Sequence, residues 1–186
     1  MKVLLHVCCG PCAIYPLEWL RSAGHEVTGV FYNPNIHPFK EFARRFETAV
    51  QWAKGVELSL MLDDAYGLEE FITLVKEDLK MPKRCAHCYR IRLRNVAQKA
   101  KTGGYDAFST SLLVSPYQQH ELIREIAEEV ATETGVAFLY HDYREGWKRG
   151  VEQSRELELY RQPYCGCIFS EQDRYYKGAG RLLAHV

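Results

Sequence analysis

Seven cysteines are distributed over three short segments of this 186-residue chain, and together they indicate metal or redox chemistry. The segments are Cys8-Cys9-Gly10-Pro11-Cys12, Cys85-Ala86-His87-Cys88 and Cys165-Gly166-Cys167. An odd number of cysteines cannot all pair, and cysteines this close in sequence cannot join distant segments. The sequence therefore predicts reactive or metal-binding thiols rather than a structural disulfide framework.

The first two clusters together offer four thiolates to one metal centre. Cys85 and Cys88 have the two-residue spacing of many metal-binding pairs, and Cys8 and Cys9 bring two more sulfurs. Four thiolates suit either a tetrahedral zinc ion or an iron–sulfur cluster. Adjacent cysteines are uncommon among zinc-binding pairs, so the sequence favours the iron–sulfur cluster. Cys12 could be a ligand, a substrate-facing thiol or a core residue, and we expect a core or supporting position.

The third cluster predicts a redox-active pair. A disulfide between Cys165 and Cys167 would close a small, strained ring, which makes the bond easy to reduce. Gly166 permits the unusual backbone geometry that such a turn needs. The alternative interpretation is a pair of free, buried cysteines.

The elements that must position these thiols alternate between strand and helix. Apolar runs predict strands at residues 2–7, 27–32, 56–62, 107–113 and 136–140. Apolar spacing of three and four residues predicts helices at residues 12–23, 39–53, 68–79, 91–101 and 121–134. This alternation predicts an α/β fold, a parallel sheet between two helical layers. The segment after residue 143 is too polar for a central strand, so we expect a helical C-terminal segment that carries the Cys165-Gly166-Cys167 turn.

The first thiols fall at the expected reactive edge of this sheet. In open parallel sheets, reactive groups lie beyond the carboxyl ends of the strands, and Cys8 and Cys9 follow the first strand directly. The helix that begins there adds the positive end of its dipole. This loop is neither a dinucleotide-binding glycine motif nor a P-loop. Asp63 and Asp64 follow another predicted strand at the same edge, so a catalytic carboxylate and a helix N-cap are both open there.

Composition and charge narrow the class of protein. The chain carries 24 basic and 24 acidic residues, which excludes a polybasic nucleic-acid binder. Positive charge gathers near the second and third cysteine clusters, which permits a phosphate-bearing substrate. These residues are Lys80, Lys83, Arg84, Arg90, Arg92, Arg94, Lys148, Arg149, Arg155 and Arg161. A solvated helix face is the alternative for each of them.

Length, apolar runs and the N-terminal segment predict the organisation of the chain. The length fits a single domain over residues 1–186. No apolar run is long enough for a membrane helix, and the chain opens on a strand rather than a secretory signal. We therefore expect a cytoplasmic protein.

The histidines are weaker candidates than the cysteines. His37 and His120 lie in or beside loops and could meet a substrate, although a structural role is the commoner outcome. His87 lies between two presumed ligands, so its side chain should point away from the metal.

Five ordered motifs give the chain a resemblance to a known family. They are Cys8-Cys9-Gly10-Pro11-Cys12, Tyr32-Asn33-Pro34-Asn35-Ile36-His37-Pro38, the segment Arg84-Cys85-x-x-Cys88-Tyr89-x-x-Arg92-Leu93, Ser111-Leu112-Leu113-Val114-Ser115-Pro116-Tyr117-Gln118, and Tyr164-Cys165-Gly166-Cys167-Ile168-Phe169-Ser170. In this order, over residues 2–176, they resemble the cobalamin-independent epoxyqueuosine reductase family. The family's sheet resembles the nucleotide α-hydrolase-like, Rossmann-like fold.

The resemblance implies an activity and a set of site residues. The activity is reduction of epoxyqueuosine to queuosine at the wobble position of tRNA, the last step in making that base. Family ligands for a [4Fe-4S] cluster map onto Cys8, Cys9, Cys85 and Cys88, and the family's redox-active pair maps onto Cys165 and Cys167. Asp64 is the candidate catalytic carboxylate, on a looser alignment. The electron donor, the proton donor, the oligomeric state and an additional metal ion beside the cluster stay open.

The residues agree with that activity. Conversion of an epoxide to an alkene takes two electrons and two protons, and a dithiol can supply both. Tyr32, Tyr89, Tyr117 and Tyr164 could stack on a splayed base, although packing within the protein is the alternative for each.

Two other functions compete with this interpretation. A tRNA sulfur-transfer or nucleotide-activating enzyme of the same fold would need an ATP loop after the first strand, where this chain has Cys8 to Cys12. A non-catalytic zinc-binding module would leave Cys165 and Cys167 without a role.

Overall fold

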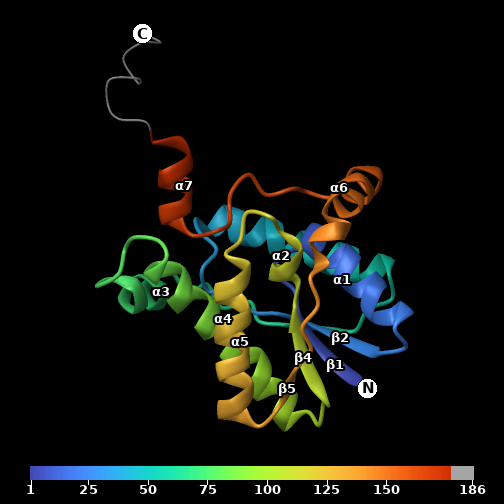
Figure 1. Ribbon diagram of the computed structural model, residues 1–186. Helices are drawn as coiled ribbons and strands as arrows, with labels where there is room; N and C mark the ends of the chain where they lie inside the picture. The colour runs from blue at the N-terminus through green and yellow to red at the C-terminus, as the bar shows by residue number, and fades with distance from the viewer. Residues whose placement is uncertain (177–186) are drawn as a thin grey trace.

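The protein is built around one parallel sheet (Figure 1), seen in a computed structural model that describes residues 1–176. The sheet has five strands in the order β3-β2-β1-β4-β5. They are β1 (Lys2–His6), β2 (Glu26–Phe31), β3 (Leu60–Leu62), β4 (Ala107–Thr110) and β5 (Ala137–Phe138). The predicted α/β fold is confirmed. The predicted single domain ends at residue 186, and its residues 177–186 lie outside the described part of the chain.

Helices connect the strands, because parallel neighbours cannot be joined by a tight hairpin. The helices are α1 (Gly10–Ser22), α2 (Phe39–Gly55), α3 (Leu68–Val75), α4 (Lys83–Thr102), α5 (His120–Thr134), α6 (Trp147–Glu156) and α7 (Ile168–Tyr175), with short 3-10 helices η1 (Ser111–Val114) and η2 (Tyr143–Gly146). The predicted helical C-terminal segment corresponds to η2, α6 and α7. Among residues 1–176, no helix is both long and apolar enough to cross a membrane.

Alternating side chains of the central strand define the layers. Leu4 packs with Leu93 and Ile126 from α4 and α5, in one fully buried cluster. Its neighbours Val3 and Leu5 point the other way and pack with residues of α1 and α2 in a second cluster. Figure 1 shows α1 and α2 on one side of the strands and α4 and α5 on the other. The period of two along the strand thus produces a sheet buried on both faces.

The sheet order creates a natural crevice between β1 and β4. The chain moves outward from β1 to β3 and then crosses back to β4 on the other side of β1. Such a reversal leaves a crevice beyond the carboxyl ends of the two strands. Cys8 follows β1 there and Ser111 follows β4, and the backbone N–H of Cys8 donates a hydrogen bond to Ser111 Oγ at 3.0 Å.

Two predicted boundaries near the crevice were wrong. The fourth strand ends at Thr110, whose hydroxyl accepts a hydrogen bond from the backbone N–H of Leu112 and starts η1. The helix expected at residues 91–101 begins at Lys83, directly after Pro82. Because proline is tolerated at the start of a helix, the second cysteine cluster lies inside the first turns of α4 rather than ahead of it.

Candidate metal and redox site

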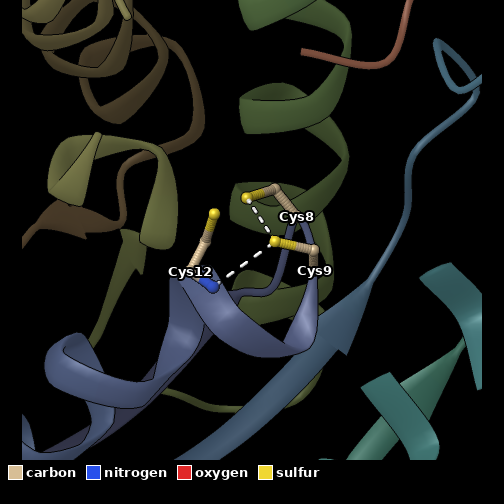
Figure 2. A group of neighbouring side chains, drawn as sticks. All are labelled: Cys8, Cys9 and Cys12. Carbon is tan, nitrogen blue, oxygen red and sulfur yellow. Dashed lines mark hydrogen bonds between the residues drawn. The ribbon is translucent and has the colours of Figure 1, made fainter. Parts of the chain in front are cut away.

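Cys8, Cys9 and Cys12 form a compact group of thiols at the junction of β1 and α1 (Figure 2). Their three sulfurs lie within 4.8 Å of one another, a spacing that could hold a metal ion. Cys9 is the N-cap of α1, and its sulfur accepts a hydrogen bond from the backbone N–H of Cys12 at 3.4 Å. The thiols therefore lie at the positive end of a helix, where thiolates are stabilised.

The three thiols of this group differ in pKa, because their burial and their hydrogen bonds differ. Hydrogen bonds from the thiols of Cys12 and Cys9 hold the pKa of the Cys8 thiol well below its usual range. Ser111 Oγ also donates to Cys8 Sγ, at 3.3 Å. Burial raises the pKa of Cys9, and the hydrogen bond to Cys8 raises that of Cys12. Gln162 Nε2 donates to the sulfurs of Cys9 and Cys12 at 3.0 and 3.2 Å. Cys8 is thus the residue of this group best able to become a thiolate.

Cys85 and Cys88 lie one turn apart at the start of α4. Their spacing of three residues places both on one face of the helix. Cys85 is half-buried and Cys88 is buried. Burial raises the pKa of both thiols, that of Cys88 to about 11. Neither sulfur belongs to the 4.8 Å group, so the structure does not bring the four predicted ligands within contact of a single ion.

Arg92 lies one turn beyond Cys88 and is 3% exposed. Its Nη2 donates to Cys88 Sγ at 3.1 Å, and its Nε donates to the carbonyl oxygen of Cys88 at 3.0 Å. The groups that interact with its charge are thiols and a phenol, among them Cys8 and Cys165. The interpretation of Arg92 as a residue on a phosphate-binding surface was therefore wrong. It supplies positive charge to the cysteines from inside the protein.

The other three arginines of α4 form ion pairs with carboxylates. Arg84 is buried and forms an ion pair with Asp173, with 2.6 Å between Nη2 and Oδ2. Arg90 forms an ion pair with Glu129 of α5, and Arg94 forms one with Glu133 at 2.7 Å. These pairs neutralise three of the positive charges that the sequence left open for a phosphate-bearing substrate.

The Cys165-Gly166-Cys167 turn is held by hydrogen bonds to α2 and to the loop that precedes it. Arg45 of α2 donates hydrogen bonds to the carbonyl oxygens of Tyr164 and Cys165 at 3.0 and 3.1 Å. The backbone N–H of His37 donates to the Gly166 carbonyl oxygen at 2.9 Å. Gly166 has φ +130°, a backbone conformation that residues other than glycine rarely adopt. The turn thus has a defined geometry.

Cys165 and Cys167 occupy different environments within this turn. Cys165 is exposed, whereas Cys167 is buried and caps the N-terminus of α7 by accepting from the backbone N–H of Ser170 at 3.4 Å. A hydrogen bond from Cys167 lowers the pKa of Cys165 to about 5 and raises that of Cys167. The pair therefore combines one thiolate with one protonated thiol.

The three cysteine clusters meet at the carboxyl ends of the strands. Cys8, Cys12 and Cys165 line one cavity of about 390 Å³. On the other side of the turn, Cys167 packs with Cys88 in a small apolar cluster. The turn thus lies between the thiols after β1 and the thiols of α4, although more than 70 residues separate each cluster from the next.

The remaining predicted site residues do not face this cavity. Asp64 is exposed beyond β3, at the outer edge of the sheet, and neither it nor Asp63 lines the cavity. His37 is buried between the rings of Tyr66 and Phe71, and burial lowers its pKa to about 4. The other two histidines have polar partners: His87 Nε2 lies 2.9 Å from Asp78 Oδ2, and His120 Nε2 lies 3.2 Å from Tyr140 OH.

Some contributors to the site were not singled out from the sequence. Arg45 follows Glu41 by four residues on the buried face of α2, with 2.6 Å between Nη2 and Oε1. A charged pair at this spacing, among the apolar positions of a helix, could have indicated from the sequence that Arg45 is buried and paired. Gln162 offers no such signal, because only the fold brings it to Cys9. Of the four tyrosines considered for stacking, Tyr117 and Tyr164 line the cavity.

Comparison with known proteins agrees with this architecture. A family model described as "Epoxyqueuosine reductase QueH" matches residues 3–173. Proteins named "Epoxyqueuosine reductase QueH" from Dehalococcoides mccartyi and Thermotoga maritima are 38% and 37% identical, covering 95% of this chain in each case and 96% and 94% of the relatives. A solved structure described as a "predicted subunit of tRNA methyltransferase" from Methanocaldococcus jannaschii superposes with a TM-score of 0.58 at 12% identity, covering 84% of this chain and 75% of that one. That likeness confirms the predicted nucleotide α-hydrolase-like fold. The family match over most of its length shows that the chain belongs to the epoxyqueuosine reductase QueH family.

Proposed function

We propose that this protein reduces epoxyqueuosine to queuosine at the wobble position of tRNA. The family's name supports the reaction, and the observation that carries it is the cavity shared by Cys8 and Cys165. The cavity brings two cysteines of the Cys8, Cys9 and Cys12 group and the exposed cysteine of the Cys165–Cys167 pair to one space, which is large enough for part of a nucleotide. A tRNA substrate would place the reaction in the cytoplasm.

Cys8, Cys9, Cys85 and Cys88 would hold an iron–sulfur cluster of the [4Fe-4S] type, without cobalamin. The donor set fits this group, because all four donors are thiols and the buried guanidinium of Arg92 offsets their negative charge. A cluster of four irons also separates its sulfur ligands more widely than a single ion does, which suits ligands from two elements. When bound, such a cluster would supply one-electron transfer near the cavity. Cys12, within 4.8 Å of Cys8 and Cys9, is the thiol left for an additional metal ion.

Cys165 and Cys167 would supply the two electrons of the reaction. Formation of an S–S bond between the Cys165 thiolate and the Cys167 thiol releases two electrons and one proton. The epoxide takes up the two electrons, that proton and a second proton from the site or from water, loses its oxygen as water and becomes an alkene. The thiolate character of Cys165 prepares the pair for oxidation, since thiolates and not thiols are the reactive species. An electron donor must then reduce the disulfide before the next turnover.

The described residues that line the cavity include no carboxylate and no histidine. A proton for the epoxide oxygen would therefore come from a thiol, a hydroxyl or water at this site. The catalytic role of Asp64 stays a prediction of the sequence, and its exposed position beyond β3 does not support it.

A single-turnover assay with anaerobically prepared, pre-reduced protein tests this function. One equivalent of tRNA carrying epoxyqueuosine should be converted to queuosine by the wild-type protein. Cys165→Ser and Cys167→Ser should keep the iron and sulfide content of the wild type yet lose the reaction. Normal multiple turnover by both variants would contradict the role of the dithiol, and no conversion by the wild type would contradict the proposed reaction.

A further inference from the structure

The cavity above the thiols carries an unusual balance of charge. The charged side chains that line it are the three arginines Arg45, Arg161 and Arg174, and no acidic residue among residues 1–176 lines it. Arg45 is committed to the fold, because it is 3% exposed, pairs with Glu41 and holds the Tyr164–Cys165 backbone. Two arginines are therefore left to meet a ligand.

Arg161 and Arg174 are exposed and have no acidic partner within residues 1–176. Neither forms an ion pair or a side-chain hydrogen bond with another residue of the described chain, and Arg174 only approaches the ring of Tyr175, at 5.8 Å. Arg161 lies in the segment between α6 and the Cys165-Gly166-Cys167 turn, and Arg174 lies in α7. Both arginines line the same cavity without an acidic partner among residues 1–176, and a phosphate group is the ligand that such guanidinium groups bind best.

An aromatic pair lines the same cavity. Tyr117, which follows η1, is 84% exposed. Its ring lies 5.8 Å from the ring of Trp147 at the start of α6, with an angle of 82° between the planes. A side chain this exposed contributes little to the packing of the protein itself, so Tyr117 is available to a ligand. Exposed aromatic rings beside arginines are typical of sites that bind unstacked nucleotides, because the rings stack on the bases and the arginines donate hydrogen bonds to the phosphates.

We propose that Arg161 and Arg174 bind phosphates of the RNA strand on either side of the modified nucleotide, and that Tyr117 provides a stacking surface for an adjacent base. The proposal rests on the proposed function, because it takes tRNA as the substrate. It assigns selection of an RNA strand over a free nucleoside to these three residues. The arginines of α4 are excluded from that role, since Arg84, Arg90 and Arg94 are paired with carboxylates.

Salt-dependent binding of an anticodon stem-loop RNA tests the arginines. For a single strand, the slope of log Kd against log salt concentration changes by roughly 0.7 for each phosphate contact removed. Arg161→Ala and Arg174→Ala should each weaken binding roughly tenfold and reduce the slope by about that amount. Arg155→Ala is the matched control, because Arg155 is exposed on α6, outside the cavity, and should bind as the wild type does.

The position of Tyr117 is tested with two substitutions. Tyr117→Ala should weaken RNA binding roughly tenfold without changing the salt slope, whereas Tyr117→Phe should bind as the wild type does. Binding needs no chemistry, so it separates this proposal from the proposed reaction. A wild-type salt slope in the Arg161→Ala, Arg174→Ala double variant would overturn the proposal even if tRNA is reduced. Slower reduction by an acidic electron-carrier protein, with RNA binding unchanged, would also overturn it and assign the arginines to donor docking.

Discussion

The guanidinium group of Arg92 donates a hydrogen bond to the thiol sulfur of Cys88, with 3.1 Å between Nη2 and Sγ. Arg92 is buried, and no carboxylate of the described chain forms an ion pair with it. The cysteines Cys88, Cys8 and Cys165 are the groups positioned to balance its charge. An unpaired buried charge costs several kcal/mol, so Arg92 favours the thiolate forms of these cysteines, free or metal-bound.

Removal of this charge should shift the potential of the iron–sulfur cluster proposed above. We predict that Arg92→Met lowers the midpoint potential by roughly 60–130 mV, the equivalent of a charge-assisted hydrogen bond of about 1.5–3 kcal/mol to a ligating sulfur. A redox titration followed by visible absorbance measures the shift. Arg94→Met is the matched control, because Arg94 is exposed and pairs with Glu133. Equal midpoint potentials in the wild type and Arg92→Met would contradict the prediction.

The second prediction concerns the cysteines proposed as cluster ligands. Cys8→Ala, Cys9→Ala, Cys85→Ala and Cys88→Ala should each lose the iron–sulfur cluster, because one missing thiolate opens an iron to solvent and oxidation. Cys12→Ala should keep it. Iron and acid-labile sulfide content of anaerobic protein measures both outcomes. A Cys85→Ala protein with full iron beside a Cys12→Ala protein without iron would instead assign the centre to the group of Cys8, Cys9 and Cys12.

The positions of the thiols relative to the sheet followed from the sequence, because strand order and burial depend on simple patterns. Val3 to Val7 reads as an apolar run, and a run that ends in cysteines places them at a strand's carboxyl end whatever the rest of the fold does. The direction of individual side chains did not follow. Arg92 and Arg90 are both basic residues of α4, yet one points to Cys88 and the other to Glu129. Only the packing of α4 against the sheet and α5 separates them.

Gly166 makes a third prediction, on stability. Its φ of +130° disfavours a side chain, and an added Cβ would lie 3.1 Å from Arg45 Nη1 and from Asn35 Nδ2. Gly166→Ala should therefore lower the free energy of unfolding by about 1–3 kcal/mol. Denaturant unfolding of the reduced protein measures this. Gly55→Ala is the control, because an added Cβ there meets no atom within 4 Å and its φ is not positive. Equal losses in both variants would show that the Cys165-Gly166-Cys167 turn does not depend on glycine.

Asp64 makes a fourth prediction. It is exposed and lies outside the cavity, so Asp64→Asn should keep the single-turnover rate of the wild type. The assay is conversion of epoxyqueuosine in tRNA by pre-reduced protein. A rate lowered a hundredfold, the scale expected on loss of a general acid, would restore Asp64 as a proton donor and require the β3 edge to approach the substrate.

The ionisation of Cys165 makes the last prediction. The hydrogen bond from Cys167 lowers its pKa to about 5, so the thiolate is present above that pH and is lost as the pH falls through it. The alkylation rate of Cys165 by iodoacetamide should therefore be nearly constant from about pH 6 to pH 9, whereas an ordinary thiol with a pKa of about 8.5 gains roughly tenfold per unit below that value. Cys167→Ala removes the donor, so the alkylation rate of its Cys165 should rise with pH as an ordinary thiol's does. Mass spectrometry of the peptide that contains Cys165 gives both profiles. A wild-type rate that climbs steadily between pH 7 and pH 9 would show that Cys165 is protonated at neutral pH, and the pair would then lack the thiolate that the proposed oxidation uses.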